Sequence, residues 1–175
     1  RAIYYADLLK AWGDVPARFE PTTSETIYLP KTNRDEIYKR LIADLEEAAE
    51  LVPWPNEASY TSNVERINKA FVKGLRAKLC LVAGGYSQYP DGIRLSNDPE
   101  LDRTTMYTIA LNECREVIQS GTARLEPSFE QLWRKFNADD ISAGGESLWE
   151  IPFSPGRGRW LFTFAVRHRS VDKYT

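Results

Sequence analysis

Side chains suited to metal or nucleophilic chemistry are few in this chain. It contains two cysteines, Cys80 and Cys114, and one histidine, His168. A structural zinc site needs about four Cys or His ligands and a catalytic one about three, so we predict no metal site. Both cysteines fall in apolar stretches with helical periodicity, where a buried thiol is the commoner role. Whether the two form a disulfide stays open.

Sequence motifs for catalysis are also missing. The chain has no Gly-x-Ser-x-Gly, no Gly-x4-Gly-Lys and no His-Glu-x2-His. Asp139 and Asp140 could form a carboxylate pair of the kind that glycosidases use, but adjacent acids in a polar loop are more often solvated surface. We therefore predict that the chain is not an enzyme and has no cofactor.

Aromatic side chains outside the periodic segments are the better candidates for binding a ligand. Flat apolar faces flanked by guanidinium, amide or carboxylate groups can hold a ligand by contact and by hydrogen bonds. The predicted ligand-binding residues are Trp160, Arg157, Arg159, Tyr89 and Trp54. Trp160 is the leading candidate because it follows Arg157 and Arg159 in a glycine-rich stretch. Trp54 and Tyr89 could instead pack against neighbouring helices.

Most other aromatic residues lie on helical stripes and are expected in the core. The predicted packing residues are Tyr5, Trp12, Phe71, Tyr107 and Phe129, and Trp149 is expected to be buried too.

Composition favours one globular domain. The chain has 175 residues, with 23 Lys and Arg against 25 Asp and Glu, which gives a net charge of −2. That length is typical of a single domain with its own core. A near-neutral chain lacks the basic surface of a nucleic-acid-binding protein, so no nucleic acid is expected. The longest uncharged run, from Leu79 to Pro90, is too short to span a membrane.

Hydrophobic periodicity predicts a mainly α protein. Helices are expected at about 2–12, 33–52, 65–83 and 104–120, with a short fifth helix beginning at Ser128. Long loops cover 13–33 and 90–102, and alternating apolar residues over 147–153 indicate a strand or extended segment. The first residues continue a helical pattern without an initiator Met or a signal sequence. We therefore expect the chain to be part of a longer protein.

The first four helices form two pairs with tetratricopeptide-like spacing, in which bulky residues alternate with small ones. The pairs cover about 1–53 and 65–121, and 122–175 adds the short helix, the strand and loops within a single domain, 1–175. The matching residues are Tyr5, Leu8, Leu9, Trp12, then Leu41, Leu45, Ala48, Pro53, then Leu79, Val82, Ala83, Tyr86, and Ala110, Cys114, Val117. Any two amphipathic helices can satisfy so loose a pattern. Long loops replace the usual short turns, and function is expected there.

Five motifs in chain order resemble the SusD/RagB outer-membrane lipoproteins of Bacteroidetes. They are Arg1-Ala2-Ile3-Tyr4-Tyr5 with Trp12-Gly13-Asp14-Val15-Pro16, Arg34-Asp35-Glu36-Ile37-Tyr38 with Asp44-Leu45-Glu46-Glu47-Ala48, Asn68-Lys69-Ala70, Val117-Ile118-Gln119-Ser120-Gly121, and Glu146-Ser147-Leu148-Trp149-Glu150-Ile151-Pro152-Phe153. The chain departs from the family at Lys69 and Lys73, where small or apolar residues are common, and it lacks the lipid-anchored N-terminal cysteine.

This resemblance implies a SusD-like receptor on the outer face of the outer membrane. It would bind an oligosaccharide or peptide nutrient and deliver it to a SusC-like TonB-dependent transporter. Its lipid anchor would lie outside this chain. The alternative is a tetratricopeptide-type scaffold that binds a protein or peptide.

Overall fold

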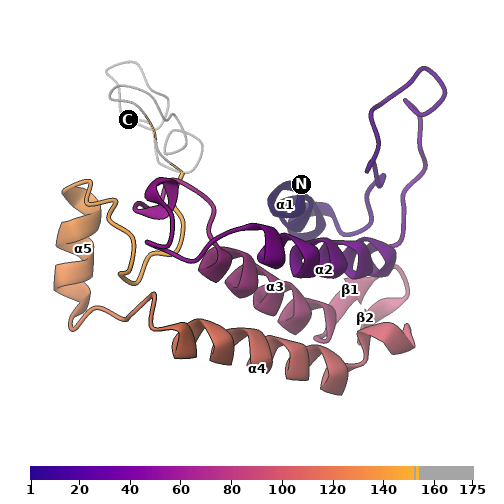
Figure 1. The fold of residues 1–175 in the computed structure, drawn as a ribbon. Coiled ribbons are helices and arrows are strands. Elements are labelled where there is room, and N and C mark those ends of the chain that lie inside the picture. The colour runs from indigo at the N-terminus through magenta and orange to yellow at the C-terminus, as the bar shows by residue number, and fades with distance from the viewer. Residues whose placement is uncertain (152, 154–175) are drawn as a thin grey trace, which may run out of the picture.

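The computed structural model describes residues 1–151 and 153, and helices form most of them (Figure 1). The helices and strands in chain order are α1 (Ala2–Trp12), α2 (Arg34–Leu51), the 3₁₀ helix η1 (Ser59–Thr61), α3 (Lys69–Ala83), β1 (Ser87–Tyr89), β2 (Gly92–Arg94), the 3₁₀ helix η2 (Pro99–Leu101), α4 (Arg103–Ser120) and α5 (Phe129–Asn137). The predicted mainly α class is therefore confirmed.

Helices α2, α3 and α4 pack side by side and run in alternating directions (Figure 1). The backbone N–H of Lys69 donates to the Pro53 carbonyl, which places the start of α3 beside the end of α2. At the other end, Gly84 closes α3 against the first turn of α4, where a Cβ on Gly84 would lie 2.9 Å from the Met106 Cβ. Helix α1 packs on α2.

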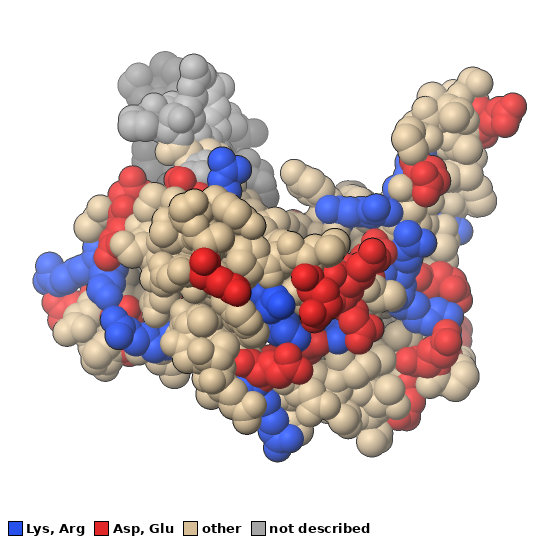
Figure 2. Space-filling model, in the orientation of Figure 1, with Lys and Arg blue, Asp and Glu red and all other residues tan. Residues whose placement is uncertain are grey.

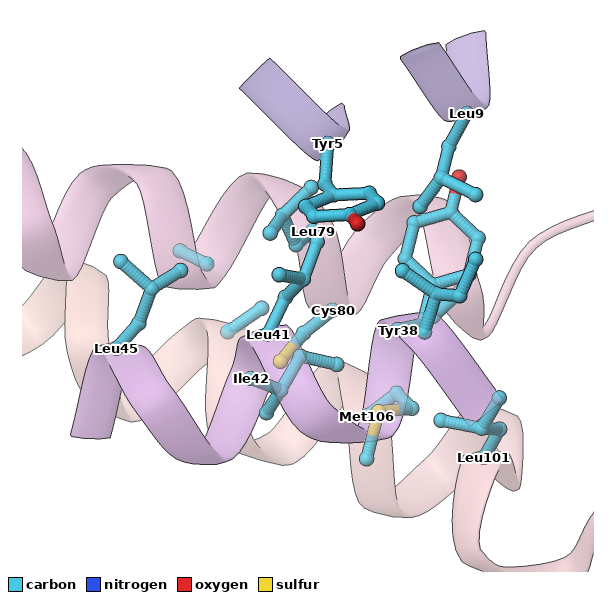
Figure 3. Close-up of a cluster of buried hydrophobic side chains, with 14 of the residues drawn as sticks. Tyr5, Leu9, Tyr38, Leu41, Ile42, Leu45, Leu79, Cys80, Leu101 and Met106 are labelled. Carbon is cyan, nitrogen blue, oxygen red and sulfur yellow. The ribbon is translucent and has the colours of Figure 1, made fainter. Parts of the chain in front are cut away.

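Apolar side chains from these four helices meet in one core. Tyr5 and Leu9 point from α1 toward α2 and α3, where Leu41 and Leu79 lie (Figure 3). The buried apolar residues of this core are Tyr5, Leu9, Val15, Ile37, Tyr38, Leu41, Ile42, Leu45, Ala49, Val72, Ala77, Leu79, Cys80, Ala83, Leu101, Met106 and Ala110. The predicted helical stripes therefore supply the inner faces, as helical periodicity requires.

Side-chain caps fix where the helices begin. Asn33, Asn68, Asp102 and Ser128 each accept a hydrogen bond from a backbone N–H in the first turn of the helix that follows. Such caps satisfy N–H groups that have no partner within the helix. The Asn68 cap places the start of α3 four residues later than the predicted 65. Gly121 ends α4 in the left-handed conformation, with φ 65°.

The loop between α1 and α2 extends away from the helical layer (Figure 1). Its base is closed where Val15 and Thr32 form an isolated β-bridge. Farther out, the Arg18 guanidinium donates to the Thr26 carbonyl at 2.7 Å, and Tyr28 is 91% exposed.

An antiparallel hairpin that the sequence analysis missed, β1 and β2, spans the start of the second predicted loop. Ser87 pairs with Arg94 and Tyr89 with Gly92. Each strand has only three residues, and neither shows the apolar alternation that indicates a strand.

Residues 147–151 form no regular strand and pass beside the start of α3. The Asn68 side-chain amide donates to the Leu148 carbonyl at 2.9 Å, and the Glu150 N–H donates to the Val64 carbonyl. Of the two predicted forms, the strand is therefore wrong for 147–151. Pro152 lies outside the described residues.

Candidate functional site

A groove in the described part of the chain lies between α5 and the segment that returns to α3. It has a volume of about 950 Å³. One wall is α5, which stands at one end of the helical layer (Figure 1). The opposite wall includes Asn56, the turn at Gly144 and Gly145, and Trp149. A groove of this size, with mixed apolar and polar walls, is typical of a small-molecule site.

Three aromatic side chains of α5 line this groove in a row. Phe129, Trp133 and Phe136 recur at spacings of four and three, which places them on one face of the helix. Neighbouring ring centroids lie 6.4 Å apart in both steps, with interplanar angles of 22° and 28°. The three residues are 76%, 57% and 59% exposed. Large, nearly parallel apolar rings are therefore open to solvent here.

Charged groups border the aromatic row. Lys135 Nζ donates to Glu126 Oε1 at 2.7 Å, and the Glu126 backbone N–H donates to Glu146 Oε2 at 3.0 Å. Ser142, through its side chain and its backbone N–H, lowers the pKa of the Asp140 carboxyl. Asp140 is therefore ionised at neutral pH and offers an acceptor for hydrogen bonds.

Surface exposure corrects part of the predicted core. Tyr5 is buried, and Phe71 and Trp149 are partly buried, with their rings 4.8 Å apart. Trp12, Tyr107 and Phe129, however, are exposed. Periodicity identifies one face of a helix but does not show whether another element covers it. In the described residues, Trp12 and Phe129 keep about three-quarters of their surface open and Tyr107 keeps 41%.

Among the predicted ligand-binding residues, Tyr89 and Trp54 have structural contacts. Tyr89 is only 5% exposed, and its hydroxyl donates to Asp35 Oδ1 at 2.7 Å. Its ring is therefore closed to a ligand, which corrects the candidate role. Trp54 is partly buried below the Lys69 ammonium, 5.7 Å from the ring centroid.

Trp160, Arg157 and Arg159 lie outside the described residues. Their role in binding stays a prediction. The structure instead identifies Trp133 and Phe136 as exposed residues of the groove, and the sequence analysis had not proposed either as a ligand contact. One signal was available: α5 is a strongly amphipathic helix of only nine residues, followed by a polar loop.

Two of the family-like motifs have structural explanations. Arg34 Nε donates to Asp14 Oδ1 at 2.8 Å, which joins the exit of α1 to the first residue of α2. Gly13 has φ 68°, and a Cβ there would collide with the Arg34 guanidinium, so this turn requires glycine. Asn68 both caps α3 and holds the returning segment at Leu148. These motifs therefore stabilise the scaffold.

A buried ionic cluster joins α3 to α4. Lys73 Nζ lies 2.9 Å from Glu113 Oε2, and Arg76 pairs with the other oxygen of the same carboxylate. Lys73 also contacts Glu116, and Arg76 contacts Glu46. Burial disfavours the charged Lys73, but hydrogen bonds to Glu116 and Glu113 outweigh it and raise the Lys73 pKa. Because its partners are all within the scaffold, this cluster is structural.

Both cysteines are free thiols. Cys80 is buried between the helices, whereas Cys114 is exposed on α4. Within residues 1–151 and 153, no group of three or more His, Cys, Asp or Glu side chains is placed to hold a metal ion. No helix in this described part is both long and apolar enough to cross a membrane. Basic and acidic side chains are interspersed on the face shown in Figure 2.

Two solved structures share this fold. A SusD homologue from Bacteroides thetaiotaomicron VPI-5482 is 22% identical with a TM-score of 0.68, and the match covers 88% of this chain and 27% of that one. A SusD superfamily protein from Bacteroides fragilis NCTC 9343 is 21% identical with a TM-score of 0.65, and the match covers 89% and 29%. The sequence matches no protein-family model, and no curated protein matches it.

The expected SusD-like fold is thereby confirmed, and at these identities the likeness concerns the fold alone. The chain spans less than a third of the length of either solved structure.

Proposed function

We propose that this chain belongs to a SusD-like receptor that captures an oligosaccharide at the cell surface. The receptor passes its ligand to a SusC-like TonB-dependent transporter in the outer membrane. It is held there by a lipid anchor outside these 175 residues. The observation that carries this proposal is the shared fold with two SusD-type structures over nearly nine-tenths of the chain.

The chemistry of the described surface supports capture of a sugar. A sugar ring has an apolar C–H face and a rim of hydroxyl groups, so it needs aromatic rings beside hydrogen-bonding groups. The groove at α5 offers both, in Trp133 and Asp140. Trp160, Arg157, Arg159 and Trp54 remain proposed contacts to the same class of ligand.

The test is a carbohydrate array probed with the complete protein, with peptides of similar length as controls. Selective binding of one class of glycan is the expected result. The receptor without its transporter partner should still bind the glycan, because capture precedes delivery. Binding of peptides with no glycan bound would contradict the proposal.

A tetratricopeptide-type scaffold for a protein or peptide is the second candidate. It is favoured by exposed apolar side chains on α4, namely Tyr107, Leu111 and Ile118. Such a face can accept an amphipathic helix. The peptide arm of the array tests it directly, and Leu111→Asp should abolish peptide binding while leaving glycan binding unchanged.

A further inference from the structure

We infer that the aromatic row of α5, formed by Phe129, Trp133 and Phe136, is the binding surface for a neutral oligosaccharide that lies along the helix. The inference rests on the proposed function, and it adds both the place of binding and the class of ligand. Of these three residues, the sequence analysis had assigned Phe129 to the core.

The geometry of the row suits a chain of sugar rings. Its three aromatic rings follow one another in two equal steps of 6.4 Å, and the planes of neighbouring rings differ by no more than 28°. Three exposed rings in a row along one helix offer apolar surface to more than one sugar ring of an extended oligosaccharide. Covering these exposed rings with the C–H faces of sugars removes apolar surface from water, which favours binding.

Polar groups within reach of the row suit the hydroxyl groups. Asp140 and Glu150 line the groove with carboxylate oxygens, which accept hydrogen bonds. Asn56 contributes a side-chain amide, which already donates to the Ala143 carbonyl and keeps its oxygen available as an acceptor. A ligand with many O–H donors therefore finds acceptors along the wall opposite the rings.

The charge of the groove selects against anionic sugars. Its walls carry four acidic residues and two basic ones, and Lys135 is paired with Glu126. Apart from this ion pair, the charged residues of the groove are three acids, Asp140, Glu146 and Glu150, and one base, Arg124. Like charges brought together in a partly enclosed site repel, so a uronic acid polymer is disfavoured relative to a neutral one.

The experiment measures affinity by titration calorimetry on the complete protein. The probes are neutral hexasaccharides (malto-, cello-, manno- and xylohexaose) and an acidic one, hexagalacturonate. Trp133→Ala should weaken binding of the best neutral hexasaccharide by about tenfold, since one stacking contact is lost. Phe129→Ala and Phe136→Ala should each weaken it by a smaller factor.

Trp12→Ala is the matched control, because Trp12 is another exposed tryptophan, on α1, that does not line this groove. Its affinity should equal that of the unsubstituted protein. Thermal unfolding is recorded for every variant, and Trp133→Ala should melt at the same temperature as the Trp12→Ala control. Trp133→Phe keeps a smaller ring and should bind with intermediate affinity.

Each outcome separates the inference from the proposed function. Neutral glycan binding that Trp133→Ala leaves unchanged overturns the inference and keeps the function. Preferential binding of hexagalacturonate does the same. A large fall in the melting temperature of Trp133→Ala shows that the ring is covered in the complete protein, which also overturns the inference. Binding of peptides and of no glycan overturns both.

Discussion

The Lys73 ammonium lies 2.9 Å from the Glu113 carboxylate in the buried interface between α3 and α4. Arg76 approaches the same carboxylate from the next turn of α3. Lys73 is one of the two lysines that the sequence analysis noted as departures from the family-like pattern, and the structure shows what stabilises it there. A buried cation is tolerated because a buried anion on the facing helix compensates its charge.

We expect Glu113→Gln to destabilise the protein strongly. Lys73 and Arg76 would then be two buried cations without their shared anion, and breaking a buried pair in this way costs about 3–5 kcal/mol. Chemical denaturation should show the loss as a lower midpoint with an unchanged slope. Glu116→Gln is the matched control, since this half-exposed carboxylate also contacts Lys73. Its loss should cost at most about 1 kcal/mol, and equal effects of the two variants would contradict this account.

Tyr89→Phe should lower stability without changing ligand affinity. The Tyr89 hydroxyl donates to Asp35 Oδ1, and Asp35 is buried at the start of α2. Removing the donor leaves a buried carboxylate oxygen with one partner fewer, which costs about 1–3 kcal/mol. Ser96 still donates to the other oxygen and limits the loss. Calorimetric glycan titration of the same variant checks that ligand affinity is unchanged. Weakened binding would restore Tyr89 as a ligand contact.

Stability should fall in the alkaline range partly because of the same residue. Burial and the hydrogen bond to Asp35 raise the pKa of Tyr89 to about 12 from the ordinary 10. A group with a raised pKa holds its proton better in the folded protein, so its contribution is complete below pH about 10 and is lost between about 10 and 12. The free energy of unfolding should therefore decline less steeply in Tyr89→Phe across that interval. Parallel curves for the two proteins would argue against the Asp35 contact.

The two thiols should react at different rates. Burial raises the pKa of the Cys80 thiol to about 11, whereas Cys114 is exposed on α4. The thiolate is the reactive form, so a buried thiol with a raised pKa is inert at neutral pH. Ellman's reagent should label Cys114 first and Cys80 only in denaturant. Cys114→Ser should remove the fast phase, and its persistence would mean that Cys80 is accessible.

Two glycines, one inside α3 and one at its end, should respond in opposite directions to alanine. A Cβ on Gly84 would lie 2.9 Å from the Met106 Cβ and 3.3 Å from the Arg103 Cα, so Gly84→Ala should force α4 outward at a cost of about 1–3 kcal/mol. Gly74 lies inside the helix, and its added Cβ would meet only the Leu148 side chain at 3.4 Å. Gly74→Ala should stabilise the protein by about 0.5–1 kcal/mol through helix propensity. Thermal unfolding of both variants measures these effects. A lower melting temperature for Gly84→Ala indicates close packing of α3 on α4, and an unchanged one would indicate a loose contact.

The amino-acid sequence by itself determined the helices and their inner faces. The stripe formed by Ile37, Leu41 and Leu45 recurs every three to four residues, and burying such a stripe is the main source of helical stability in water. Local signals also marked the ends of helices, since Gly121 adopts a left-handed conformation that other residues avoid. The turn motif around Asp14, together with the motifs that follow it along the chain, was enough to indicate a SusD-like fold.

Tertiary structure decided which residues are available to a ligand. Tyr89 and Trp133 are both aromatic residues near polar neighbours, yet one is buried against Asp35 and the other lines an open groove. Exposure depends on contacts between elements distant in the chain, such as the return of Leu148 to Asn68 across eighty positions. The pairing of Lys73 with Glu113 likewise joins two elements that are distant in the chain. Periodicity along a chain carries no information on such contacts, because it describes one element at a time and burial is a property of several packed together.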